Sequence, residues 1–425
     1  LLLFMAGTLA AATSTGLTQM VGARFVQGVG GGALFTSCRI LVNMMFSQTD
    51  RVRASRIFML GIFSASALGP AFAAELVDRG VWQDVFYGVL PFAALATIGA
   101  WLLLPDAEAR DDVEGPGLGP LLLFGVAIVA LQATLTEARF DVFSHPIRIA
   151  LIAALALALL TVFLWQQWHH EKPVLHLRAL YQPVFLTGLA MYFVYYMISN
   201  LAAYVFPIYA EQALRFPLAT TGWLNTFAAT ISLVGIWVYQ RVARKLKHKK
   251  PLMTTGLLLM AGAMTWFSFM PPDVGPPALI VGLIGKGLFG VMVIIPIAGL
   301  TFGSLAGDDF AHGYRSKNLI RQIASSFASA LGAVLLQNRQ FAVHTSLVHA
   351  LGQRPAETEQ WMHTVQAALV ARGFEAGQAH AGALAQLAAL VDQQARLIAC
   401  EDLYRLIAVL AMAAAVFMLV QRRLD

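Results

Sequence analysis

Arg24 and Gln27 are a charged and a polar residue three positions apart, inside an otherwise apolar run that extends from residue 17 to residue 46. Residues three apart share one face of a helix, so the two side chains can interact. An arginine at the centre of a membrane helix costs about 2.5–3.5 kcal/mol, so it normally faces a protein interior or a water-filled cavity. If the run crosses a bilayer, the pair predicts a hydrogen-bonding position in such a cavity. The alternative is that Arg24 extends its side chain to the lipid headgroups.

The composition of the chain identifies the environment of this pair. Of the 425 residues, 58% are hydrophobic and 12% are charged, and the mean hydropathy is +0.68. Soluble domains contain about 45–50% apolar and about 25% charged residues. Apolar runs recur along the whole length, and each is long enough to cross roughly 30 Å of hydrocarbon. We therefore predict an all-α integral membrane protein. A β-barrel is excluded, because its segments would be about ten residues long with alternating polarity.

Polar residues, proline and glycine divide the sequence into about twelve predicted spans, at 1–14, 17–46, 54–77, 82–105, 118–136, 147–168, 184–209, 218–240, 252–270, 277–304, 317–340 and 400–421. Lysine and arginine are concentrated in alternate connections, such as "RVARKLKHKKP" and the terminal "QRRLD". By the positive-inside rule these connections are cytoplasmic, so we expect a cytoplasmic C-terminus. The net charge of +6 is then a topology signal, and nucleic acid is not an expected partner.

One connection is long, from about 344 to 399, and is predicted to be on the outer side. It is rich in Ala, Gln and His, with helical periodicity. We expect amphipathic helices that lie at the outer surface or extend the neighbouring spans. Its histidines have no metal-ligand spacing, and Cys38 and Cys400 form neither a metal motif nor a disulfide framework. No metal and no cofactor is therefore expected.

Two small-residue segments predict close helix contacts. Gly28, Gly30 and Gly31 come after Gln27 and let a neighbouring backbone approach, because small residues mediate helix association in lipid. Packing alone would explain them as well. Gly69 and Pro70 lie inside another span, where proline frees a backbone carbonyl and permits bending.

The other charges within spans are also cations. Arg39, Lys286 and Arg321 lie inside predicted spans, and Gln322 follows Arg321. Lys286 could be structural or could line a cavity, and the sequence leaves both open. The carboxylates near the spans lie at span ends instead, at Glu75, Asp84, Glu137 and Glu211.

Four segments in the right order resemble motifs of the major facilitator superfamily, in its drug:H⁺ antiporter branch with fourteen spans (the EmrB/QacA type). "RFVQGVGGG" resembles R-x-x-Q-G-x-G, and "ALGPAFAAELVDRGVWQDVFYGVLPF" resembles the antiporter motif G-P-x-x-G-G with its following aromatic segment. "KPVLHLRALYQPVF" is similar to the segment before the ninth span. "NLIRQIASSFASALG" is similar to a later span with N-x-x-R-Q.

The resemblance implies a major facilitator fold with about twelve visible spans of an expected fourteen. Residues 1–105 would be the remainder of the N-terminal lobe (family spans 3–6), residues 106–183 two inserted linker spans (7–8), and residues 184–425 the C-terminal lobe (9–14). The first two family spans would then be missing, so the chain is expected to be N-terminally truncated. An acidic proton-coupling residue would lie in those spans, or the coupling chemistry would be unusual.

The sequence departs from the family pattern at several positions. The glycine pair of the antiporter motif is Ala73-Ala74 here, and its Asn is Val89. "YAEQ" brings Glu211 to the expected outer mouth, where it could collect protons or cationic substrate, or be a solvated loop residue. Lys286 occupies a position where the family often has Arg.

The resemblance implies a proton-driven secondary transporter that exports drugs or other small molecules by alternating access. Arg24, Gln27, Lys286 and Arg321 would serve proton coupling or line the cavity. It would be a multi-pass protein of the inner membrane and not an enzyme. Its partners would be a small-molecule substrate, protons and lipid, with a periplasmic adaptor and an outer-membrane channel as further candidates.

Other classes remain open from the sequence. Uptake or metabolite transport on the same fold, and a non-transporting scaffold or receptor, are both compatible with it. A channel would show a filter or pore-lining ring, and a membrane enzyme would gather polar residues at one depth. Neither pattern is visible. The sequence contains no phosphate-binding loop motif, so nothing in it indicates a built-in ATPase.

Overall fold

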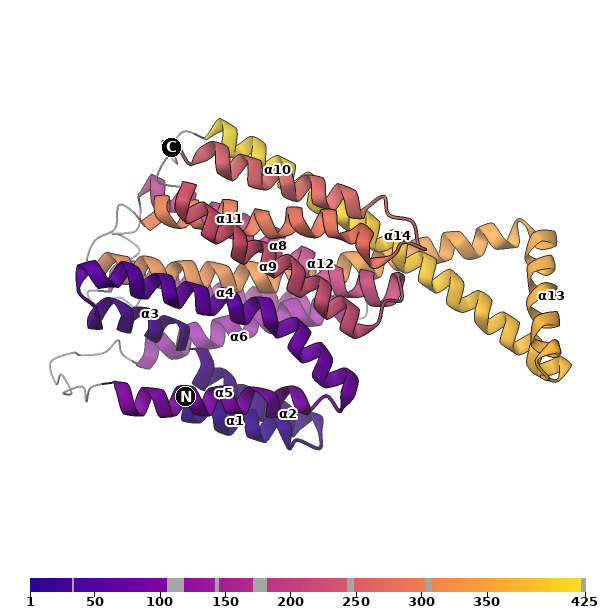
Figure 1. The fold of residues 1–425 in the computed structure, drawn as a ribbon, viewed down its shortest axis with the longest axis horizontal. Helices are drawn as coiled ribbons and strands as arrows, with labels where there is room; N and C mark the ends of the chain where they lie inside the picture. The colour runs from indigo at the N-terminus through magenta and orange to yellow at the C-terminus, as the bar shows by residue number, and fades with distance from the viewer. Residues whose placement is uncertain are drawn as a thin grey trace. The chain divides into compact units, whose positions relative to one another are not determined.

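The computed structural model describes residues 1–32, 34–104, 118–141, 145–170, 182–242, 248–302 and 308–421. Every regular element in these ranges is a helix (Figure 1). The predicted all-α fold is therefore confirmed. Most of the "KPVLHLRALYQPVF" segment and the boundary of the predicted linker near residue 106 lie outside the described ranges.

The chain forms two compact units. Unit 1 comprises Leu1–Glu114 and Pro217–Val234, and unit 2 comprises Gly115–Phe216 and Gly235–Asp425. Unit 1 contains α1 (Leu2–Ala12), α2 (Leu17–Gly32), α3 (Leu34–Met45), α4 (Gln48–Arg79), α5 (Asp84–Leu103) and the first part of α9 (Leu218–Val242). Ser47 caps α4, where its hydroxyl accepts a hydrogen bond from the Asp50 N–H at 3.3 Å.

Unit 2 contains the remaining elements, including the end of α9. They are α6 (Leu118–Asp141), α7 (Pro146–His169), α8 (Pro183–Pro207), the π-helix η1 (Ile208–Ala213), α10 (Lys250–Phe267), the 3₁₀ helix η3 (Pro276–Leu279), α11 (Ile280–Phe302), α12 (Asp308–Gly352), α13 (Pro355–Ala371) and α14 (Ala376–Val420).

Nine helical stretches among the described residues are long and apolar enough to cross a membrane. The predicted spans at 1–14, 17–46 and 252–270 coincide instead with α1, with α2 and α3, and with α10, which are not among the nine. Large apolar side chains are exposed along the helices, for example Trp101 at 83% and Leu17 at 80%. Such exposure fits a chain whose solvent is lipid.

The predicted helices between residues 344 and 399 are present, and they extend the neighbouring spans. α12 and α14 each have 45 residues, or about 68 Å at 1.5 Å per residue, against about 30 Å of hydrocarbon. α13 joins their far ends, and we call residues 344–399 the helical extension (Figure 1). The chain turns at Gly352 and Pro355 and again at Gly373, whose φ of +93° favours glycine.

Candidate functional site

Arg24, Gln27 and Thr8 form a chain of hydrogen bonds in unit 1. The Arg24 guanidinium donates from Nη1 to Gln27 Oε1 at 2.6 Å, and Gln27 Nε2 donates to Thr8 Oγ1 at 2.8 Å. Thr8 in turn donates to the Phe4 carbonyl at 2.7 Å. Gln27 and Thr8 are buried, whereas Arg24 is exposed. Two buried polar groups thus hold an exposed guanidinium in one orientation.

The ring of Phe86 on α5 adds a second contact to the guanidinium. The Arg24 Cζ atom lies 5.7 Å from the centroid of that ring, within the range of a cation–π interaction. The guanidinium thus contacts an aromatic ring of α5 as well as the amide of Gln27.

Glycines allow the close approach of α1 and α2 on which the hydrogen bonds from Arg24 to Thr8 depend. A Cβ atom on Gly7 would overlap the backbone of Gln27, and one on Gly30 would overlap the backbone N of Phe4. A Cβ on Gly31 would lie 3.0 Å from the Phe4 ring, but one on Gly28 would meet nothing within 4 Å. Gly30 and Gly31 therefore lie in the helix contact, and Gly28 does not.

The segment at Gly69 and Pro70 packs beside α9 within unit 1. The Ala71 N–H, directly after Pro70, donates to Thr226 Oγ1 at 3.2 Å. A Cβ on Gly222 would lie 2.6 Å from Ala74 Cβ and 2.9 Å from the Pro70 carbonyl oxygen. Gly69 itself has open space where a Cβ would be. The close contact thus uses a glycine of α9 that the sequence did not single out.

In unit 2, Lys286 of α11 lies against an aromatic side chain. Its Nζ is 4.9 Å from the centroid of the Phe206 ring, and the residue is partly buried. Arg321 of α12 is exposed. These two cations lie on different helices. The side chain of Arg39 lies outside the described part of the chain.

An aromatic cluster with a buried lysine was missed from the sequence. Tyr192 and Tyr196 of α8 stack with centroids 6.0 Å apart. Lys317 of α12, 8% exposed, places Nζ 4.2 Å from the centroid of Tyr314 and 5.8 Å from that of Tyr192. The signal was present in "MYFVYYM" at 191–197, with four aromatic residues in five positions. The ammonium of Lys317 thus lies over two aromatic rings, within the range of cation–π interactions.

A polar seam joins α12 to α6 and α8. Gln132 donates to Ser326 Oγ in a short hydrogen bond, and Ser325 Oγ donates to Asn200 Oδ1 at 3.0 Å. A cavity of about 230 Å³ lies along this seam, with Gln322 on its wall. Polar groups within apolar helices hold the helices together.

Glu211 lies in η1, at the end of α8. The segment around it is fixed to α14, because Arg396 Nη1 donates to Gln212 Oε1 at 2.8 Å and Gln393 Nε2 donates to the Ala213 carbonyl at 2.8 Å. Short π-helices often occur at functional positions. Glu211 is partly buried rather than fully solvated.

The family model described as Major Facilitator Superfamily matches residues 1–333. This chain is 24% identical, over 79% of its length, to "Uncharacterized MFS-type transporter YhcA" of Bacillus subtilis (strain 168), and the match covers 63% of that relative. Over 85% it is 24% identical to "Multidrug transporter protein MdtP" of the same organism, covering 66%. Over 82% it is 21% identical to "Probable multidrug resistance protein EmrY" of Escherichia coli (strain K12), covering 68%. The chain thus spans less than two thirds of the first two relatives.

The fold is also similar to that of a solved structure. A POT family transporter in complex with a thioalcohol-conjugated peptide has a TM-score of 0.56 and 13% sequence identity. The match covers 99% of this chain and 79% of that one. At this identity the likeness describes the arrangement of helices and nothing of the ligand.

Proposed function

The chain belongs to the Major Facilitator Superfamily, and from that premise we propose that it is a proton-driven secondary transporter that exports small organic molecules. The observation that carries the proposal is the hydrogen-bonded chain from Arg24 through Gln27 to Thr8. A cation so oriented within apolar helices costs stability and calls for a functional reason. The multidrug names of two relatives support the substrate class.

Arg24 would act as a fixed positive charge. Arginine does not release its proton at working pH, so it cannot itself carry the coupled proton. It would attract a carboxylate that does, or an anionic group of the substrate. Gln27 and Thr8 fix its orientation, and the planar fork of the guanidinium makes lysine a poor replacement.

Transport would proceed by alternating access, in which the substrate site opens to one side of the membrane at a time. Pro70 gives α4 a position where it can bend, and Gly222 of α9 gives the adjoining tight contact. In unit 2, Lys286, Arg321 and the tyrosines of α8 would contact substrate, and Glu211 would collect protons at the outer mouth.

The proposal also includes a branch, a domain division and a location for the protein. They are the fourteen-span branch, the lobes at 1–105 and 184–425 with two linker spans between them, and an inner-membrane location with a cytoplasmic C-terminus. A periplasmic adaptor with an outer-membrane channel would be the partner that carries substrate onward.

The test is transport by the full-length protein in liposomes. With ethidium as the probe, an imposed pH gradient should drive dye accumulation that saturates with dye concentration, and a protonophore should abolish it. A matched Arg24→Ala preparation is the control. Dye movement that ignores the gradient, or that equals the flux through empty liposomes, would contradict the proposal.

A further inference from the structure

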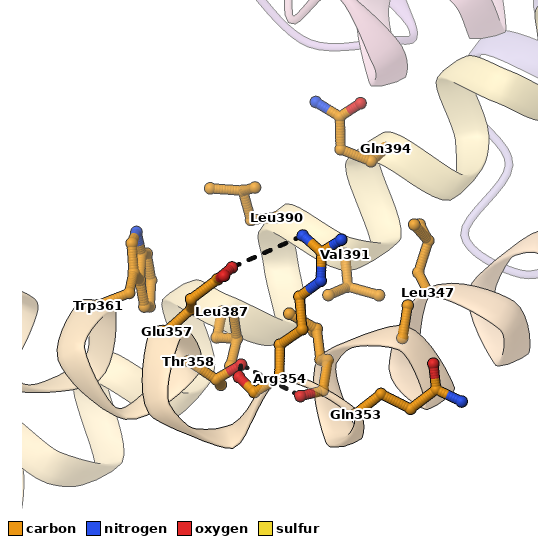
Figure 2. A pocket seen from close by; sticks show the side chains of 12 residues that line it. Leu347, Gln353, Arg354, Glu357, Thr358, Trp361, Leu387, Leu390, Val391 and Gln394 are labelled. Atoms are coloured by element: carbon orange, nitrogen blue, oxygen red, sulfur yellow. Dashed lines mark hydrogen bonds and ion pairs between the residues drawn. The ribbon is translucent and has the colours of Figure 1, made fainter.

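The helical extension contains a cavity of about 590 Å³, formed by the end of α12, the start of α13 and the first half of α14 (Figure 2). Ligand pockets in proteins measure about 300–1,000 Å³. All residues that line the cavity belong to unit 2. None of the proposed transport residues lines it.

The cavity lies beyond the apolar part of both long helices. Arg339 of α12 and Asp402 of α14 form an ion pair at 2.6 Å, and charges are expensive inside hydrocarbon. The first lining residue of α12, Leu347, and the nearest of α14, Gln394, are both eight positions further along. At 1.5 Å per residue the cavity begins about 12 Å past this ion pair. A charged pair between the apolar spans and the cavity favours water rather than lipid chains at its mouth.

The walls are mainly apolar. Five aliphatic side chains and one indole supply most of the surface, namely Leu347, Leu351, Leu387, Leu390, Val391 and Trp361. Figure 2 shows the indole of Trp361 at one end of the group and Leu347 at the other, with Leu387, Leu390 and Val391 of α14 between them. An apolar, aromatic-walled hollow in contact with water gains free energy when a flat apolar molecule fills it.

The cavity is lined by one positive and one negative side chain, Arg354 and Glu357. Arg354 Nη1 lies 3.6 Å from Glu357 Oε2, and both side chains are mostly exposed. A ligand with a net charge would gain from one of them and lose to the other. On α14, Asp392 and Arg396 pair with each other at 2.9 Å. Gln353 and Gln394 lie at the edge of the cavity (Figure 2), where their amides can bind a neutral donor or acceptor.

The walls are held in place before any ligand arrives. Thr358 Oγ1 donates to the carbonyl oxygens of Arg354 and Leu351, at 3.0 and 3.2 Å, and so fixes the turn between α12 and α13. A short hydrogen bond between Gln366 and His380 ties α13 to α14. A preformed site costs little ordering on binding.

We propose that this cavity is a second ligand site, outside the membrane-spanning part, for an uncharged aromatic organic molecule. Trp361 and the leucines take the flat body, and the glutamine amides take a hydrogen-bonding group. The site is distinct from the transport residues, so its test does not depend on transport.

The experiment uses a matched pair of fluorescent probes and the full-length protein in nanodiscs. N-phenyl-1-naphthylamine is neutral, and 8-anilinonaphthalene-1-sulfonate has the same ring skeleton with a sulfonate added. The neutral probe should bind saturably above empty nanodiscs, and more tightly than the sulfonate. Equal or tighter binding of the sulfonate, or no saturable binding of the neutral probe, would overturn the proposal.

Two variants, each with one alanine replaced by phenylalanine, test whether the probe binds in the cavity. Ala350 lines the cavity and is exposed, so Ala350→Phe should fill the space without disturbing a core. The substitution should lower the affinity for the neutral probe at least about tenfold. Ala368→Phe places the same ring on an exposed position of α13 that does not line the cavity, and should leave binding unchanged.

A photoreactive derivative of the neutral probe provides a second readout. A diazirine analogue should label peptides that contain residues 347–361 or 387–394, as read by mass spectrometry. Labelling confined to other parts of the chain, or wild-type affinity in Ala350→Phe, would show that the cavity is not the site.

Discussion

Replacing Gln27 with leucine isolates the hydrogen-bonded chain from the charge of Arg24. Gln27→Leu removes the bond from Arg24 at 2.6 Å and the bond to Thr8 at 2.8 Å, and keeps a side chain of similar size. Only the bond to Thr8 joins two helices, and hydrogen bonds between membrane helices average about 0.6 kcal/mol, with a maximum of about 1.7. Because Gln27 is only 9% exposed, leucine regains part of this loss by apolar burial. Stability should therefore fall by about 1 kcal/mol or less.

The effect on transport should be larger than the effect on stability. If the bond to Gln27 fixes the guanidinium with about 1.5 kcal/mol, its loss lowers the proton-linked rate about tenfold. Gln19→Leu is the matched control, since Gln19 is exposed on the same helix and binds Thr15 at 3.1 Å. Thr8→Val removes only the far end of the chain and should give an intermediate rate.

The assay is dye transport in liposomes under an imposed pH gradient, together with a thermal-shift measurement in detergent. A Gln27→Leu protein that transports as fast as Gln19→Leu would refute the positioning role of Gln27. A rate loss that follows only the amount of folded protein would refute it equally.

Three further predictions concern packing, the outer mouth and topology. Gly30→Ala should destabilise the protein by about 1–3 kcal/mol, because its Cβ overlaps the Phe4 backbone, whereas Gly28→Ala should be neutral in the same thermal-unfolding measurement. Equal melting temperatures for the two variants would refute this assignment of the helix contact. Glu211→Gln should lower efflux at unchanged protein level, and unchanged transport across pH would show that Glu211 serves only as a structural residue of η1. A cysteine introduced by Gln378→Cys, in a chain without the exposed native thiol, should react with an impermeant maleimide from outside the cell. One introduced by Lys249→Cys should react only from inside, and labelling from the same side would overturn the proposed topology.

The fold could be predicted because its signal is local. Apolar runs of the length of a membrane helix identify the class without any tertiary information. The extension between 344 and 399 was predicted as helical from its periodicity, which is also a local signal. The sequence did not decide whether these helices would lie flat or continue α12 and α14, since that depends on the turns at Gly352 and Gly373.

The candidate site was harder to predict because it depends on contacts between helices. That Arg24 and Gln27 share a face follows from their spacing. The partner Thr8 lies on another helix, and the register of α1 against α2 cannot be predicted from the sequence of either helix alone. The same register decides that Gly30 packs and Gly28 does not. Lys317 was missed because its aromatic surroundings come from α8 as well as from its own helix.

The measurement that tests the central claim most directly is coupled transport in the Arg24 variants of the full-length protein. Dye and proton fluxes are recorded together in liposomes for wild type, Arg24→Lys and Arg24→Ala. We predict that Arg24→Lys folds normally but loses most proton-linked transport, because it keeps the charge without the planar fork, and that Arg24→Ala loses still more. An Arg24→Ala protein that transports at the wild-type rate with unchanged pH dependence would contradict the account, and Arg24 would then be a residue that only reaches toward the lipid headgroups.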